Sequence, residues 1–299
     1  MEKKGILVIG SSNTDMTVKT AKLPVPGETV LGGEFIMGAG GKGANQAVAA
    51  KRLGGDVAFV CKVGKDVFGD NAIKDYEKEG LDTSLVMRSD KPSGVALITV
   101  DENAENCIVV ASGANNDITE ADIDAIADQI RNASILLLQL EIPVPAVRRA
   151  VEIAHEAGVF TVLNPAPACE LPEEIYKHVS LIIPNRTEAA TLTGVSVEDS
   201  VSLEEAVAVL RGRGVEKVVV TIGSEGSLIF DGETSTLVPA IKVNAIDTTA
   251  AGDTFCAGIC VGLSEGKTLK EAVEFATKAS SVTVQRMGAQ ASIPFRSEL

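Results

Sequence analysis

Short, continuous apolar runs alternate with helix patterns through most of this 299-residue chain, and this alternation is what most constrains its fold. A strand that is apolar along its whole length is buried on both faces, as happens when helices cover both faces of a mostly parallel sheet. We therefore expect an α/β fold with a central, mostly parallel sheet flanked by helices on both faces. The strands are predicted at residues 5–10, 57–63, 135–140, 159–163, 181–183 and 218–222, and the helices at 44–53, 70–79, 119–131, 144–157 and 202–211.

Two segments break this rhythm. Residues 17–37 are extended and interrupted by polar residues, with Pro24, Pro26 and Gly27 in a turn, and residues 94–100 and 106–111 form a predicted hairpin. We interpret them as an accessory β-sheet outside the main layer, suited to a lid or a subunit contact; the alternative is a pair of solvent-facing excursions. Because no flexible linker interrupts the chain, we expect one domain over 1–299, with lid segments at approximately 14–38 and 94–112.

The charge balance limits the partners. The chain has 27 Lys and Arg residues against 41 Asp and Glu residues, a formal net charge of −14. Nucleic acids and anionic membranes bind basic faces, so the excess of acid argues against either as the main partner. A negatively charged substrate would need local cationic or N–H groups and a metal ion.

Cysteine usage and the N-terminal residues indicate the compartment. The five cysteines are odd in number and scattered, which predicts reduced thiols rather than a disulfide framework. His155 and His178 have no ligand partner at a metal-binding spacing. The first apolar run, residues 6–9, is too short for a signal peptide or a membrane span. We expect a cytoplasmic protein.

The most informative motif for function is residues 247–253, Asp-Thr-Thr-Ala-Ala-Gly-Asp, followed by an apolar run to Leu263. It predicts a tight turn of small residues that opens a helix, with Asp253 in the first helical turn. Free N–H groups at such a helix end attract an anion. In phosphoryl transfer they would hold developing phosphate charge while Asp253 takes a proton from the attacking hydroxyl. The alternative is a carboxylate that only caps the helix.

A glycine-rich stretch at residues 38–43 contains the Gly-x-Gly-x-x-Gly pattern. A dinucleotide site needs this pattern at the first β–α turn with an acid ending the next strand, whereas that strand here ends in Cys61-Lys62-Val63. We instead predict a loop that lets a polyhydroxy ligand approach the backbone, with Lys42 and Asn45 donating hydrogen bonds. A glycine-rich turn with a solvated lysine is the alternative.

Polar residues also follow several predicted strands, where open α/β sheets bind ligands. Asn13 and Asp15 follow the first strand and could bind adjacent hydroxyls or form an Asx turn. Glu141 closes the strand at 135–140. Asn185 and Glu188 have the spacing of a capping box, or could place a carboxylate near Mg²⁺ waters. The glycines of residues 221–226 could bound a nucleotide pocket.

In combination and order, these motifs resemble the ribokinase-like (PfkB) carbohydrate kinase family along essentially the whole chain. The matching pieces include residues 13–15, 26–29, 40–47, 139–141, 164–167, 185–188, 221–226, 247–253 and 288–290. The resemblance implies ATP-dependent phosphorylation of D-ribose at its 5-hydroxyl, giving ribose 5-phosphate. It also implies Mg²⁺ dependence, activation by a monovalent cation such as K⁺, and a homodimer formed through the β-lid.

The resemblance also implies roles for individual residues. Asp253 would be the general base, and the N–H groups of Ala250, Ala251 and Gly252 would form the anion hole. The sugar would be held by Asn13, Asp15, Gly41, Lys42, Gly43, Asn45 and Glu141. ATP would contact Asn185, Glu188, Thr221, Gly223, Ser224, Gly226, Gly252 and Thr277, with Glu188 organising Mg²⁺ through water. The monovalent cation would lie near Asp247, Thr249, Thr283, Arg286, Gly288 and Ser292.

Three positions depart from the family pattern. Cys256 stands where Asn is common, Thr277 where Asn or His is frequent, and Arg186 where an acid is usual. Other acceptors, such as deoxyribose, a nucleoside or a ketohexose, are the nearest alternative function. A non-catalytic sugar- or nucleotide-sensing protein is a second, and an NAD-dependent dehydrogenase a third.

Overall fold

The main sheet is mixed but mostly parallel. In the computed structural model, which describes residues 5–103, 105–232 and 235–299, it has nine strands in the order β13-β12-β11-β10-β9-β8-β1-β4-β5. All neighbouring pairs from β11 to β5 are parallel, whereas β12 and β13 are antiparallel additions at one edge. The strands are β1 (Ile6–Ile9), β4 (Val57–Gly64), β5 (Val86–Ser89), β8 (Ile135–Leu138), β9 (Phe160–Leu163), β10 (Leu181–Ile182), β11 (Lys217–Thr221), β12 (Gly226–Phe230) and β13 (Ser235–Pro239).

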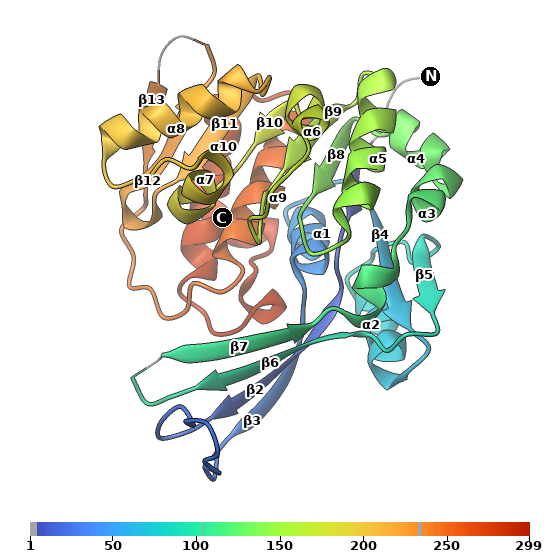
Figure 1. Ribbon diagram of the computed structural model, residues 1–299, viewed down its shortest axis with the longest axis vertical. Helices are drawn as coiled ribbons and strands as arrows, with labels where there is room; N and C mark the ends of the chain where they lie inside the picture. Colours follow the sequence, from blue (N-terminus) through green and yellow to red (C-terminus); the bar gives the residue numbers. More distant parts are fainter. Residues whose placement is uncertain (1–4, 104, 233–234) are drawn as a thin grey trace.

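Helices cover both faces of this sheet (Figure 1). On one face Leu7 and Ile9 pack into a core with α3 to α8, and on the other Ile6 and Val8 pack with α1, α2, α9 and α10. Adjacent residues of β1 thus belong to different cores, which is why its sequence is continuously apolar. The helices are α1 (Lys42–Arg52), α2 (Val67–Lys78), α3 (Glu120–Ala125), α4 (Ala127–Asn132), α5 (Val144–Glu156), α6 (Glu173–His178), α7 (Arg186–Thr193), α8 (Ser200–Gly212), α9 (Ala251–Ser264) and α10 (Leu269–Thr283).

The accessory segments form a second sheet that projects from one end of the main body (Figure 1). Among the described residues it has four strands in the order β3-β2-β6-β7, with β2 parallel to β6 and the other pairs antiparallel. Its strands are β2 (Asn13–Lys19), β3 (Phe35–Gly40), β6 (Gly94–Val100) and β7 (Asn106–Ala111). The predicted fold class, an α/β sheet with a small β-sheet lid, is confirmed, and the excursion alternative is wrong.

Two predicted helices differ from the observed helices by more than two residues at an end or by an internal break. The single helix expected at 119–131 is two helices, α3 and α4, because the backbone at Ile126 (φ −110°, ψ 18°) leaves the helical conformation. No glycine or proline marks this break, so the apolar spacing could not locate it. The helix expected at 70–79 begins earlier, at Val67, where the Asp66 side chain accepts a hydrogen bond from the Gly69 N–H. No helix in the described part of the chain is long and apolar enough to cross a membrane.

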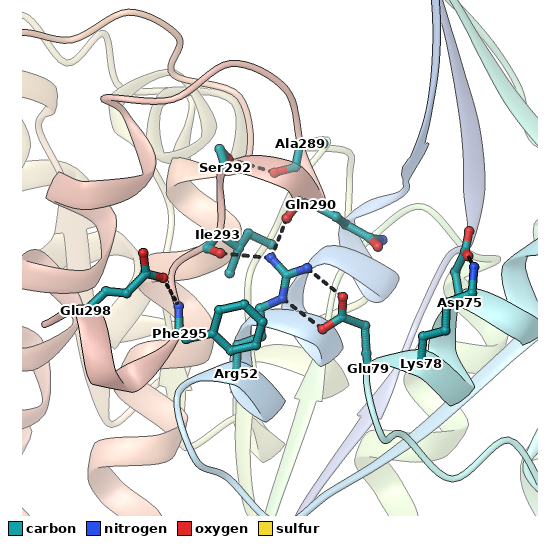
Figure 2. Close-up of polar contacts among 10 residues, drawn as sticks. All are labelled: Arg52, Asp75, Lys78, Glu79, Ala289, Gln290, Ser292, Ile293, Phe295 and Glu298. Atoms are coloured by element: carbon teal, nitrogen blue, oxygen red, sulfur yellow. Dashed lines mark hydrogen bonds and ion pairs between the residues drawn. The ribbon is translucent and has the colours of Figure 1, made fainter.

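The C-terminal segment, which includes the short 3₁₀ helices η3 (Gln290–Ser292) and η4 (Arg296–Glu298), is tied to α1 by Arg52 (Figure 2). The Arg52 guanidinium donates to both carboxylate oxygens of Glu79, at 2.8 and 2.6 Å. It also donates to the carbonyls of Gln290 and Ile293, at 2.6 and 2.8 Å, and lies 4.9 Å from the centre of the Phe295 ring. One side chain therefore joins the end of α1, the residue after α2 and the last ten or so residues.

This contact predicts a large loss of stability when Arg52 is removed. Arg52→Ala should lower the free energy of unfolding by about 3 kcal/mol, because the Glu79 carboxylate and two carbonyls lose a shared, partly buried donor. Arg52→Lys should recover little of that loss, since an ammonium group cannot present the same planar fork of donors. Chemical denaturation measures both.

The control is Arg131→Ala, which removes an exposed pair with Asp128 and should change stability by less than about 1 kcal/mol. Equal losses for Arg52→Ala and Arg131→Ala would show that the Arg52 contact contributes nothing special.

Candidate active site

A cavity of about 920 Å³ lies between the lid sheet and the ends of the main strands. One wall is apolar and comes from the lid: Ala96, Ile98, Ile108 and Val110. The opposite side is polar and carries most of the predicted site. The predicted residues that line the cavity are Asn13, Asp15, Gly41, Lys42, Asn45, Glu141, Asn185, Glu188, Thr221, Asp247, Thr249, Ala250, Gly252, Asp253 and Gly288.

Helix α9 begins at this cavity. Its N-cap is Ala250, which is left-handed (φ 59°) and is the sole non-glycine residue with positive φ in the described chain. Ala250 has no side-chain oxygen to cap the helix, so the first-turn N–H groups are available to an anion. Ala251 is an exception, because its N–H donates to the Thr248 carbonyl at 3.2 Å. Ala250 and Gly252 line the cavity, whereas Ala251 does not.

Asp253, in the first turn of α9, is a buried carboxylate with 7% of its surface exposed. Its Oδ2 accepts a hydrogen bond from Asn45 Nδ2 at 2.9 Å, and its Oδ1 accepts one from Gln46 Nε2 at 3.0 Å. Burial raises the pKa of Asp253, and the Lys42 charge and the two amide donors offset only part of that rise. A carboxyl group with a raised pKa beside an uncapped helix end is suited to accept a proton near neutral pH.

The glycine loop before α1 brings backbone close to the polar residues of β2. A Cβ on Gly40 would lie 2.2 Å from an Asp15 carboxylate oxygen, and one on Gly41 (φ 89°) would lie 2.8 Å from the Asn13 nitrogen. Position 41 therefore requires glycine, whereas a side chain at position 40 would displace the Asp15 carboxylate. Gly43 does not line the cavity; its N–H donates to Ser11 Oγ at 3.2 Å, and its role is to pack α1 against β1.

Charged groups crowd this end of the cavity. Burial, together with the nearby Glu141 and Asp253 carboxylates, raises the pKa of Asp15 to about 6. Burial alone would lower the pKa of Lys42, but the carboxylates of Asp253, Glu141 and Glu188 outweigh it and the pKa is raised. Glu141 is fixed by Ser11 Oγ at 2.5 Å and by the Lys42 N–H at 2.9 Å. Lys42 thus remains a cation among several acids.

On the other side of Asp253, Asn185 caps α7. Its side chain accepts from the Glu188 N–H and Glu188 Oε2 accepts from the Asn185 N–H, both at 2.8 Å. Burial raises the pKa of Glu188. Its Oε1 has no hydrogen-bond partner among the described residues, so this carboxylate fits the outer coordination of a Mg²⁺ ion carried by phosphates.

Four of the residues expected at the nucleotide do not line this cavity: Gly223, Ser224, Gly226 and Thr277. The first three lie at and after the short 3₁₀ turn η2 (Gly223–Glu225), and a Cβ on Gly226 (φ 117°) would lie 2.1 Å from the Val238 carbonyl oxygen. Gly226 therefore has a structural role in the β12–β13 hairpin. The Thr277 hydroxyl donates to the Val273 carbonyl of its own helix at 2.8 Å.

Of the residues expected to bind the monovalent cation, some line the cavity and others do not. Asp247 accepts from the Thr249 N–H and hydroxyl at 2.9 and 2.6 Å and from the Gly288 N–H at 2.8 Å, so it joins two loops at the cavity wall. These oxygens fit a hard cation. Thr283, Arg286 and Ser292 do not line the cavity. Their side chains contact Thr254, Glu298 and the Ala289 carbonyl, respectively. The described residues contain no cluster of three or more His, Cys, Asp or Glu side chains that could hold a metal unaided.

No sequence motif assigns a role to Gln46, Gln139 or Asn164, which form a buried hydrogen-bonded group that contacts Asp253 through Gln46. The signal that could have found them is an amide inside an otherwise apolar or small-residue run. Of the departures, Cys256 is buried, lines the cavity one turn beyond Asp253, and has a thiol whose pKa is raised by burial. Arg186 pairs with Glu225 at 2.8 Å.

Comparison with known proteins agrees with this geometry. The model of the pfkB family of carbohydrate kinases matches residues 3–296. The chain is 42% identical over 297 residues to a ribokinase of Haemophilus influenzae, covering 99% of this chain and 97% of the relative. It is 36% identical to a deoxyribokinase of Salmonella typhi, covering 97% and 95%. It spans 55% of a bifunctional ribokinase/ribose-5-phosphate isomerase A of Fructilactobacillus sanfranciscensis, to which it is 42% identical.

Among solved structures, the fold is similar to that of Arabidopsis thaliana ribokinase complexed with ribose and ATP. The TM-score is 0.93 with 34% sequence identity, covering 99% of this chain and 97% of that one. Family match, sequence identity and fold agree along nearly the whole length, and the dehydrogenase interpretation of the glycine pattern is therefore wrong. The chain belongs to the pfkB family of carbohydrate kinases and is a ribokinase-type sugar kinase.

Proposed function

We propose that this chain transfers the γ-phosphoryl group of ATP to the 5-hydroxyl of D-ribose. The observation that carries the proposal is the position of Asp253, a buried carboxylate at the uncapped end of α9 in the cavity below the lid. In the reaction the hydroxyl proton moves to Asp253 as the sugar oxygen bonds to phosphorus and ADP leaves. The backbone N–H groups of Ala250 and Gly252 stabilise the charge on the transferred group, whereas the Ala251 N–H stays bound to the Thr248 carbonyl.

The start of β2, the segment after β8 and the start of α1 provide the sugar contacts. Asn13, Asp15, Asn45 and Glu141 present acceptors and donors for hydroxyl groups, and the glycine loop lets the ring approach the backbone. The aliphatic wall of the lid suits the opposite, less polar side of the sugar. Closure of that wall excludes water, which would otherwise compete as the phosphoryl acceptor.

ATP occupies the part of the cavity beside Asn185, Glu188 and Thr221. Mg²⁺ on its phosphates would neutralise charge there, with Glu188 holding it through water. A monovalent cation such as K⁺ would be held beside the anion hole by Asp247 and Thr249, and would fix the loop that precedes α9. Because Asp247 accepts a hydrogen bond from the Gly288 N–H, a cation that orders the loop before α9 would also order the loop that contains Gly288.

The first test is Asp253→Asn, which should lower kcat by about 10²- to 10⁴-fold because no group then takes the hydroxyl proton. Ribose affinity should change little. The variant is tolerated structurally, since Asn45 Oδ1 has no partner among the described residues and its amide can rotate to accept from the new Nδ2. Steady-state ADP release and calorimetric ribose binding measure the two effects. Asp128→Asn, at an exposed site, is the control; near-normal turnover of Asp253→Asn would refute the assignment of the base.

The second test is an acceptor panel in which ADP release is followed with pentoses, 2-deoxyribose, nucleosides and ketohexoses, each with K⁺ and with Na⁺. Ribose should give the highest kcat/KM, with 2-deoxyribose lower by about tenfold or more, because a missing hydroxyl leaves a buried polar group of the site unpaired. Turnover should rise with K⁺. If 2-deoxyribose equals or exceeds ribose, the acceptor assignment is wrong while the kinase chemistry stands.

We also propose a cytoplasmic homodimer formed through the lid. The cysteines, which all lie in the described part of the chain, are free thiols, as a reducing compartment would keep them. On the lid face opposite the cavity, Leu97 and Val109 are directly paired across β6 and β7 and are 51% and 61% exposed. A sheet that is apolar on both faces suits a subunit contact.

This proposal predicts that Val109→Lys converts a dimer into a monomer, because two like charges would face each other across a two-fold contact. Light scattering coupled to size exclusion gives the mass of each protein. Lys91→Ala, which removes an exposed partner of Asp117, is the control that should leave the mass unchanged. A monomeric parent protein, or a dimeric Val109→Lys variant, would contradict the lid interface.

A further inference from the structure

Three amide side chains form a hydrogen-bonded group that reaches Asp253 through Gln46: Gln46 on α1, Gln139 after β8 and Asn164 after β9, the last of which also lines the cavity. Gln46 and Gln139 have no exposed surface, and Asn164 is 8% exposed. Burying an amide is costly unless each of its polar atoms has a partner. Gln46 meets that requirement fully, and its partners define which way round its amide must lie.

The orientation of these amides is set by a backbone carbonyl. Asn164 Nδ2 donates to the Ile183 carbonyl oxygen at 3.1 Å, and a carbonyl can only accept. Asn164 must therefore present its Oδ1 to Gln46, which donates to it from Nε2 at 3.0 Å. Gln46 Oε1 in turn accepts from Gln139 Nε2 at 2.5 Å. Rotating the Gln46 amide by half a turn would break both contacts.

Gln46 Nε2 has one remaining hydrogen, and it is directed at Asp253 Oδ1 at 3.0 Å. The partner of the other carboxylate oxygen is held differently. Asn45 Nδ2 donates to Oδ2 at 2.9 Å, but Asn45 Oδ1 has no partner among the described residues. The Asn45 amide is thus free to rotate, whereas the Gln46 amide is not. The two oxygens of Asp253 are chemically distinct in this fold.

We propose that Gln46 is a positioning residue for the base, and that it commits Asp253 Oδ1 to a fixed hydrogen bond and leaves Oδ2 to receive the proton of the attacking hydroxyl. When Oδ2 is protonated, Asn45 rotates and accepts that proton's hydrogen bond through its own Oδ1. Gln139 and Asn164 act one step farther back, by holding the Gln46 amide. This inference rests on the proposed function of Asp253 and deepens it.

The same contact favours the ionised form of the base. A hydrogen bond to a carboxylate favours the charged form and so opposes the effect of burial on its pKa. Other groups also face Asp253, and each contributes to its titration: Lys42 from α1, Glu141 after β8, Asp15 from β2, Glu188 from α7 and Cys256 from α9 itself. A substitution at Gln46 changes none of these groups, so its effect on the pKa of Asp253 can be assigned to the lost hydrogen bond.

The kinetic test compares Gln46→Met, which keeps the length of the side chain but donates no hydrogen bond, with the parent protein. Loss of the donor raises the pKa of Asp253, so the fall of kcat at low pH should move to higher pH by about one pH unit. Turnover above pH 8 should change much less than turnover at pH 6. Gln46→Glu should shift the profile farther, because two adjacent carboxyl groups share a proton.

Two further variants test whether Gln139 acts on Asp253 through the Gln46 amide. Gln139→Met, which releases the Gln46 amide without touching Asp253, should shift the profile in the same direction by a smaller amount, and it serves as the test if Gln46→Met does not fold. Gln129→Met, at an exposed position of α4, should have no effect. A loss of kcat in Gln46→Met that is the same at every pH would overturn the proposal, since a purely structural role predicts that result.

A thermal-unfolding measurement keeps this test separate from catalysis. Because burial raises the pKa of Asp253 above its unfolded value, the ionised carboxylate costs stability at pH 8, and Asp253→Asn should raise the Tm there. The rise should be larger by about 2 °C in the Gln46→Met background, where the charge has lost a donor. If no sugar is phosphorylated, the proposed function fails but this comparison still decides; an equal rise in both backgrounds overturns the role of Gln46.

Discussion

The site depends on one constraint, which is that a carboxylate is buried at the start of α9 and must be compensated there. Helix α1 supplies most of the compensation. Asn45 and Gln46 lie three and four residues after Lys42, so all three lie on the face of α1 that meets Asp253. Small residues of both helices, such as Ala49 on α1 and Ala257 on α9, are fully buried in the core that the two helices share. Close packing of the helices is thus part of how the charge is stabilised.

The alternation of apolar strands and helices was sufficient to predict the main sheet, because the physical cause is local. A strand buried on both faces must be apolar throughout, and β1 and β8 show that pattern without ambiguity, whereas β11 shows it in its central valines. What it could not predict was the edge of the sheet. β12 and β13 are antiparallel and partly exposed, so their sequences carry neither the continuous apolar signal nor a helical period between them.

Site residues could be predicted where the sheet topology brings the ends of neighbouring strands together. They were harder to predict where the role of a residue depends on side chains far away in the sequence. Asn13 and Glu141 follow neighbouring parallel strands, and such ends meet at one edge of a sheet. Gln46 has no such signal, since its importance comes from Asn164 and Gln139, both of them about a hundred residues away. Thr283 and Ser292 fit a family pattern, and their side chains contact Thr254 and the Ala289 carbonyl. Contacts of this kind have no signal in the sequence.

The charge of the cavity affects a neutral, hydroxyl-rich ligand and a polyphosphate in opposite ways. The cavity is lined by five carboxylates, from Asp15, Glu141, Glu188, Asp247 and Asp253, against two ammonium groups, from Lys19 and Lys42. A neutral, hydroxyl-rich ligand gains hydrogen bonds from such a surface without electrostatic cost. A polyphosphate would be repelled unless cations accompany it, and the N–H groups at the start of α9 cannot offset that repulsion alone. The same acidity that suits a hydroxyl-rich ligand therefore predicts that a polyphosphate binds in this cavity together with cations.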